Sequence, residues 1–86
     1  MTCVFYTAGF IRDYKKLPEA LKDEVREKIT LFEENPRTPR LRLHKLRGNL
    51  QKYLSFSVNY RYRIVVEEDS KGVYALLAVG DHDVYK

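Results

Sequence analysis

The sequence predicts an α+β fold in which a helical hairpin packs on a twisted, largely antiparallel sheet. Between residues 18 and 35, apolar side chains recur with the period of a helix. After residue 40, apolar and polar side chains alternate with the period of a strand. A length of 86 residues suffices for one domain and not for two. We therefore expect a single domain over residues 1–86, with elements in the order β-α-α-β-β-β.

The N-terminal segment predicts a strand followed by a short helix. Cys3–Thr7 is a run of β-prone residues, so the fold is expected to open with a strand. Thr7 is suited to cap a helix through Gly9–Lys16, because a threonine hydroxyl accepts a hydrogen bond from a free N–H of the first turn.

A second, longer helix is predicted between Pro18 and Asn35. Pro18 at the first helical position and Glu19 in the first turn are typical of a helix N-terminus. One face of this helix is apolar, at positions three or four residues apart: Leu21, Val25, Ile29 and Phe32. Asn35 followed by Pro36 ends the helix. Two such helices are expected to pack as a hairpin on one face of a sheet.

The rest of the chain is predicted to be rich in strands. A connector with two prolines, residues 36–40, leads into Leu41–Leu46, where apolar and polar residues alternate before a turn at Arg47–Asn49. Three strands follow, with expected bounds Tyr53–Val58, Tyr60–Glu67 and Val73–Gly80. Asn59 gives a tight turn or bulge between the first two strands, and Asp69–Gly72 is a hairpin turn.

Basic residues are concentrated in one part of the chain. Sixteen Lys and Arg against twelve Asp and Glu give a formal net charge of +4. The stretch from Arg37 to Arg63 contains eight of these basic residues, together with His44, and no Asp or Glu. A segregated basic stretch is typical of a protein that binds a polyanion. We interpret it as a nucleic-acid-binding region, the alternative being a solvated surface that happens to be basic.

Composition also limits the chemistry of the chain. Cys3 is the single cysteine, which excludes an intramolecular disulfide and, with only two histidines, a self-contained zinc site. The sequence contains no phosphate-binding glycine-rich loop and no apolar stretch near the ~20 residues of a transmembrane helix. We therefore expect a soluble cytoplasmic protein that uses no metal or cofactor and has no membrane partner.

Two arginines in the predicted strand Tyr60–Glu67 are candidate phosphate ligands. In a strand, Arg61 and Arg63 point to the same face, where their like charges repel unless an anion lies between them. A guanidinium pairs bidentately with phosphate oxygens, so an RNA phosphate would satisfy both. The alternative is a solvent-facing strand whose arginines pair with Glu67 or Glu68.

Histidine and tyrosine side chains are the candidate acid and base groups. His82 follows the last predicted strand, and an exposed imidazole acts as general acid or base near neutral pH. Tyr85 is suited to stacking on a base or sharing in proton transfer. His44 lies on the polar side of its segment, from which it can fold over the face that carries Arg63. The plainer alternatives are a surface tail with an anchoring tyrosine and a surface histidine.

These residue types are sufficient for cleavage of RNA. The 2′-hydroxyl of RNA attacks the adjacent phosphate, so the substrate supplies its own nucleophile. The protein then needs a base for the hydroxyl, an acid for the leaving 5′-oxygen, and cations for the charge on phosphorus. No serine or cysteine of this chain lies in a recognisable nucleophile motif.

Four short segments follow one another along the chain: Phe32…Asn35-Pro36, Leu43-His44-Lys45-Leu46-x-Gly48, Tyr62-Arg63-Ile64-Val65 and Gly80-x-His82-Asp83-x-Tyr85. In this order and at these separations they resemble the successive signatures of the RelE/ParE toxin superfamily, over nearly the whole chain. The resemblance implies a toxin of a type II toxin–antitoxin pair. RelE-like members are ribosome-dependent endoribonucleases that cut mRNA in the A site. The implied partners are a cognate antitoxin, the ribosome and mRNA, with operator DNA bound only through the antitoxin complex.

The resemblance also implies roles for single residues. Arg63 falls at the arginine that stabilises the transition-state phosphate, and His82 at a catalytic histidine or arginine. Tyr85 resembles a C-terminal tyrosine that stacks or assists proton transfer, and His44 matches a histidine used by a subset of members. The surrounding basic residues are expected to bind RNA: Lys45, Arg47, Lys52 and Arg61.

The chain departs from the family pattern at several positions. Leu54 and Phe56 occupy the strand in which the RelE branch has lysines, so those lysine roles do not transfer. Arg61 stands where a related branch has an acidic residue. We therefore expect a histidine-based, metal-independent site of the YafQ/YoeB type. The alternatives are a ParE-like gyrase inhibitor, which shares the fold, and a catalytically inactive member that still binds its antitoxin.

Overall fold

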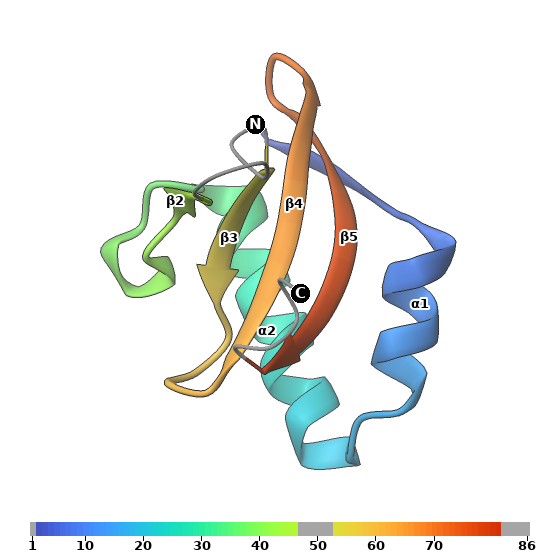
Figure 1. Cartoon of the computed structure of the whole chain (residues 1–86). Helices are drawn as coiled ribbons and strands as arrows, with labels where there is room; N and C mark the ends of the chain where they lie inside the picture. The colour runs from blue at the N-terminus through green and yellow to red at the C-terminus, as the bar shows by residue number, and fades with distance from the viewer. Residues whose placement is uncertain (1, 47–52, 82–86) are drawn as a thin grey trace.

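The computed structural model describes residues 2–46 and 53–81 and has the predicted α+β architecture (Figure 1). Its elements are β1 (Cys3–Tyr6), α1 (Ala8–Lys15), α2 (Glu19–Glu34), the short 3-10 helix η1 (Pro39–Leu41), β2 (His44–Lys45), β3 (Tyr53–Ser57), β4 (Tyr62–Ser70) and β5 (Val73–Asp81). The five strands described form one sheet in the order β1-β5-β4-β3-β2. β1 pairs in parallel with β5, and the other pairs are antiparallel. β4 is therefore the central strand.

Both predicted helices are present, and their ends follow the capping residues. The Phe10 N–H donates to Thr7 Oγ1 at 3.2 Å, so Thr7 caps α1 as predicted. α2 begins at Glu19, and Pro18 is its N-cap rather than its first helical residue. Asn35 has an extended backbone and ends α2, as expected for a residue before a proline.

α2 packs across one face of the sheet (Figure 1). Its predicted apolar face is entirely buried: Leu21, Val25, Ile29 and Phe32. These side chains share one hydrophobic core with Phe10 of α1 and with residues of β3, β4 and β5. The rings of Phe32 and Phe56 stack with their centroids 4.5 Å apart. Ile64 of β4 is buried in this core, and successive strand residues point to opposite faces, so Arg63 points away from α2.

The segment after α2 differs from the prediction. The alternation in Leu41–Leu46 does not produce one extended segment, because Arg42 ends η1 in the left-handed conformation (φ 53°, ψ 44°). Pro39 favours the 3-10 turn before it, since its ring fixes φ. Only His44–Lys45 then joins the sheet, as the edge strand β2, which the predicted order of elements did not contain.

β4 begins at Tyr62 rather than at Tyr60. Asn59 Oδ1 accepts hydrogen bonds from the N–H groups of Arg61 (2.9 Å) and Tyr62 (2.8 Å), which extends the turn to Arg61. The expectation that Arg61 and Arg63 share one strand face is therefore wrong. The Arg61 guanidinium instead lies over the Tyr62 ring, 6.0 Å from its centroid.

α1 covers the part of β5 that extends beyond its pairing with β1. The two strands pair only as far as Leu76. There the N–H and the hydroxyl of Thr7 donate to the Leu76 carbonyl oxygen, at 3.2 and 2.8 Å. Further along, Asp13 Oδ2 accepts a hydrogen bond from the Val79 N–H at 3.2 Å. α1 thus supplies hydrogen-bonding groups where a neighbouring strand would otherwise supply them.

Two further findings concern the described part of the chain alone. None of its helices combines the length and the apolar character that a membrane span requires. Within residues 2–46 and 53–81, no three His, Cys, Asp or Glu side chains gather into a group that could bind a metal ion.

Candidate functional site

Arg63 is the second residue of the central strand β4 and lies on the face of the sheet opposite α2. Its register partners are Ser57 of β3 and Gly80 of β5. Arg63 Nη1 donates a hydrogen bond to the buried Ser57 hydroxyl at 3.1 Å. Gly80 has no side chain that would crowd the arginine from β5. A guanidinium has five N–H donors, so the one bond seen among the described residues leaves the others for an anion.

His44 lies on the same face of the sheet as Arg63. Its Cα pairs with that of Ser55, and paired residues of antiparallel strands point to the same face. Ser55 is two residues before Ser57 on β3, so it shares a face with Ser57. His44 Nδ1 lies 2.8 Å from the carbonyl oxygen of Arg42, which assigns the proton of the neutral ring to Nδ1. Nε2 is then the nitrogen that accepts a proton.

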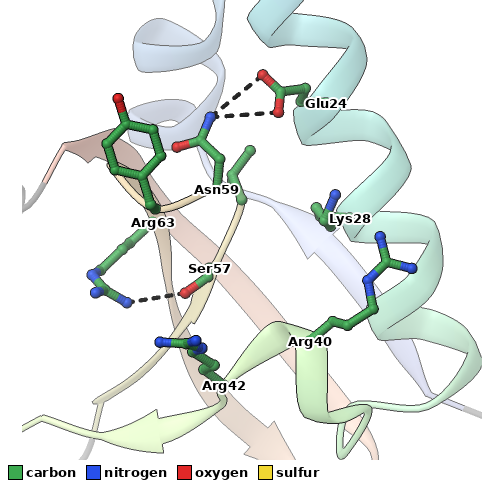
Figure 2. Close-up of a pocket in the computed structure, with 9 residues that line it drawn as sticks. Glu24, Lys28, Arg40, Arg42, Ser57, Asn59 and Arg63 are labelled. Carbon is green, nitrogen blue, oxygen red and sulfur yellow. Dashed lines mark hydrogen bonds between the residues drawn. The ribbon is translucent and has the colours of Figure 1, made fainter.

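A cleft crosses the open edge of β3 beside Arg63. β2 pairs only with Leu54 and Ser55, so it does not extend to the Ser57 end of β3. The cleft has a volume of about 480 Å³ (Figure 2). We call it the basic cleft, and it is lined by Glu24, Lys28, Arg40, Arg42, Ser57, Val58, Asn59, Tyr60 and Arg63.

Positive charge dominates the basic cleft. Four of its lining residues are cations: Lys28, Arg40, Arg42 and Arg63. Lys28 pairs with Glu27 on the same helix, with Nζ 3.3 Å from Oε1. Among the residues that the structure describes, no ion pair involves any of the three arginines. The arginine side of the cleft therefore concentrates positive charge without a carboxylate partner in this part of the chain.

The single carboxylate among these lining residues lies away from the Arg63–Ser57 pair. Figure 2 shows Glu24 beside Asn59, whereas the guanidinium groups of Arg42 and Arg63 approach the Ser57 hydroxyl. Glu24 accepts hydrogen bonds from Asn59 Nδ2 at 3.4 and 3.5 Å. Glu24 thus lies apart from Arg42 and Arg63, while Lys28 and Arg40 lie beside each other at α2.

The structure places two of the predicted site residues on one face of the sheet and the other described ones elsewhere. Arg63 and His44 share one face, as described above. Lys45 points to the opposite face from its neighbour His44, and neither Lys45 nor Arg61 lines the basic cleft. The remaining predicted residues lie outside the described part of the chain: Arg47, Lys52, His82 and Tyr85.

Sequence reasoning missed most of the basic cleft. Arg40 and Arg42 belong to the stretch without carboxylates, which indicated a region but not these two residues. Lys28 is one of several charged residues between the apolar positions of α2, and the helical pattern gave no reason to select it. Tyr60 was assigned to a strand, yet it lies in the turn before β4 and is 96 % exposed.

The sequence matches one family of known proteins over most of its length. The matching family is described as the ParE toxin of the type II toxin–antitoxin system, parDE, and the match covers residues 4–84. No curated protein sequence matches the chain significantly.

Several solved structures share the fold. YafQ from Escherichia coli superposes with a TM-score of 0.79 at 16% identity, covering 99% of this chain and 98% of YafQ. The YoeB/ParE toxin from Agrobacterium tumefaciens gives 0.75 at 15% identity, covering 94% and 99%. A chain of the toxin–antitoxin complex RelBE2 from Mycobacterium tuberculosis gives 0.74 at 26% identity, covering 94% and 98%. At such identities the similarity concerns the fold.

Proposed function

Because the chain belongs to the ParE toxin family of type II toxin–antitoxin systems, we propose that it is a toxin that cuts mRNA on the ribosome in the cytoplasm. The observation that carries this proposal is the position of Arg63 on the central strand β4. Its guanidinium donates to Ser57 of β3 and lies on the same face of the sheet as His44. An arginine fixed in this way is suited to the charge that develops on phosphorus during cleavage.

The proposed reaction is an intramolecular transesterification. His44 Nε2 takes the proton of a 2′-hydroxyl, whose oxygen attacks the adjacent phosphorus while the bond to the 5′-oxygen breaks. Arg63 stabilises the negative charge of the phosphorane. The products are a 2′,3′-cyclic phosphate and a 5′-hydroxyl, which takes its proton from a general acid. We propose His82 or Tyr85 as that acid, and Tyr85 also as a group that stacks on a base.

An antitoxin is the proposed protein partner. The family is defined by a toxin–antitoxin system, and the similar RelBE2 structure is a toxin–antitoxin complex. We expect the cognate antitoxin to bind this chain directly and to suppress its toxicity. We also expect operator DNA to be bound by the complex and not by this chain alone.

The test is induced expression followed by mapping of mRNA 5′ ends. We expect codon-periodic cuts in translated mRNA and little cleavage of naked RNA. Arg63→Ala and His44→Ala are each expected to lower the cutting rate about 100-fold or more, because each removes a group that acts in the transition state. Arg12→Ala, which removes an exposed arginine of α1, is the matched control. Undiminished cutting by both site variants would refute the proposed roles.

A second candidate is a ParE-like inhibitor of DNA gyrase, and the match to the ParE toxin family favours it. This function needs binding and no catalysis. A supercoiling assay with purified gyrase separates the two candidates. Inhibited gyrase together with intact mRNA would support the second candidate, and the absence of both effects would indicate an inactive member that only binds its antitoxin.

A further inference from the structure

We propose that the basic cleft binds the sugar–phosphate backbone of single-stranded RNA, with Tyr60 as a stacking platform for one base. The position of this subsite next to the cleaved phosphate rests on the proposed function, because Arg63 belongs to both. The subsite itself consists of residues that the proposed reaction does not use: Arg40, Arg42 and Tyr60.

The charge of the cleft favours an anionic ligand. Arg40, Arg42 and Arg63 line one cleft, and none forms an ion pair within the described ranges. In Figure 2, Arg42 and Arg63 point to the sheet side of the cleft and Arg40 lies beside Lys28 at α2. Like charges that line one cleft repel each other unless anions lie between them. A guanidinium presents a planar set of donors that matches phosphate oxygens, and consecutive phosphates supply several anions in a row. A nucleic-acid backbone therefore fits the cationic side of the cleft.

The backbone of Arg42 is strained. Its φ of 53° places it in the left-handed region, which a residue with a Cβ adopts only at a cost. Glycine adopts this region freely, so an arginine at this position lowers local stability. Strained residues of this kind cluster at ligand-binding sites, because the strain is kept for the position of the side chain. In Figure 2 the Arg42 side chain points toward Ser57, on the same side of the cleft as Arg63.

The exposure of Tyr60 favours a ligand that carries bases. Its side chain is 96 % exposed although the residue lines the cleft. The turn that presents it is fixed by Asn59, whose Oδ1 accepts two backbone hydrogen bonds and whose Nδ2 donates to Glu24. An exposed ring beside cations is the combination with which proteins bind single-stranded nucleic acid, because every base has a face that stacks. An acidic peptide would use the arginines but would leave this ring without a role.

The test is a binding measurement on the full chain by fluorescence anisotropy. The probe is a labelled single-stranded RNA of about ten nucleotides, 2′-O-methylated throughout so that it cannot be cut. Arg40→Gln and Arg42→Gly each remove one proposed phosphate contact. Tyr60→Ala removes the ring and Tyr60→Phe keeps it. Arg12→Gln on α1 removes an equal charge that lines a different part of the surface.

We expect the affinity of the wild type to fall with salt with a log–log slope of roughly −2, as for three contacts to a single strand. Each arginine variant is expected to reduce that slope by about 0.7, and Tyr60→Ala to weaken binding about five-fold or more. Tyr60→Phe and Arg12→Gln should stay within about two-fold of the wild type. Arg42→Gly should keep or raise the Tm, because glycine relieves the left-handed strain, so its weaker binding would not reflect unfolding.

Wild-type affinity for RNA in the arginine and Tyr60→Ala variants would overturn the proposal. It would equally be overturned if these variants lost affinity for the co-expressed antitoxin while RNA binding was unchanged, since the cleft would then bind protein. The two proposals fail separately. If mRNA cuts are mapped but the cleft variants bind RNA as the wild type does, only the proposed subsite is refuted. If the cleft variants bind RNA more weakly but the wild type makes no mRNA cuts in cells, only the proposed cleavage is refuted.

Discussion

At the scale of single residues, the Ser57 hydroxyl determines where the Arg63 guanidinium lies. Ser57 is buried beside Arg63 in the register of β3 and β4, and its Oγ accepts the 3.1 Å hydrogen bond from Nη1. A free arginine side chain has about 2 kcal/mol of rotamer entropy. Part of that entropy is already lost before an anion binds, which lowers the cost of ordering the arginine during the proposed reaction. Ser57 is thus a positioning residue.

Replacing Ser57 with Ala is expected to lower the rate of mRNA cleavage about ten-fold, the effect of losing one hydrogen bond to a charged group. The loss should appear in kcat, because the arginine remains present to bind phosphate but is less well oriented. Ser57→Thr retains the hydroxyl and suits a strand, so it should restore most of the rate. Single-turnover cleavage on programmed ribosomes measures both variants. Equal rates for Ser57→Ala and the wild type would contradict this role.

Part of the candidate site was predictable at this scale. Strand alternation and the family resemblance both selected Arg63, whereas its contact with Ser57 depends on the register between two strands, which no local pattern encodes. Arg40 lies in η1, and Arg42 ends that helix in the left-handed conformation. Because Arg42 is not glycine, the sequence gives no signal for that conformation. The roles of His82 and Tyr85 remain predictions.

At the scale of elements, α1 acts as a lateral partner of β5. The Val79 N–H lies beyond the end of the β1–β5 pairing, and the Asp13 carboxylate accepts its hydrogen bond at 3.2 Å. A backbone donor in a partly buried strand needs such an acceptor. The contact also fixes α1 along the strand, because Thr7 at the other end of the helix donates to Leu76.

Asp13→Ala is expected to destabilise the fold by about 1–2 kcal/mol, because it leaves the Val79 N–H without its acceptor. Asp13→Asn keeps an acceptor oxygen and should cost less than half of that value. Equilibrium urea unfolding of the purified variants measures both differences. An Asp13→Ala variant as stable as Asp13→Asn would show that the carboxylate oxygen contributes nothing as an acceptor.

Elements with a sustained period were predictable and short ones were not. The apolar face of α2 extends over several turns, and its predicted bounds are correct to within one residue. β2 contains two residues, too few to show any period, and the left-handed Arg42 interrupts the alternation before it. The start of β4 was misplaced because Asn59 Oδ1 accepts hydrogen bonds from the N–H groups of Arg61 and Tyr62, which lengthens the turn.

At the scale of the whole molecule, β5 connects the two ends of the described chain. It pairs with β1 on one side and with β4 on the other, so that Cys3 lies opposite Val73. Leu76 and Val79 of β5 are buried in the core that α2 covers. The sheet without β5 is divided into an isolated β1 and the group β2–β4.

A chain that ends at Gly72, and therefore lacks β5, is expected to be unfolded and non-toxic. It loses both strand pairings and the buried side chains of β5, and a domain of this size has only about 5–10 kcal/mol of stability to lose. Circular dichroism of the purified chain and growth after induction measure the two effects, with the 86-residue chain as control. A cooperative thermal transition in the shortened chain would show that β5 is dispensable.

The same topology has a consequence for biosynthesis. Val73 is made seventy residues after its partner Cys3, an interval of roughly 4–14 s at ordinary rates of translation. Arg63 is made ten residues before Val73, so β4 has no β5 beside it until the last of the described strands has been made. The proposed cleavage site therefore assembles only after nearly all of the described chain has left the peptidyl-transferase centre. If the proposed activity is correct, we expect the nascent chain to be inactive toward the ribosome that makes it until β5 has been made.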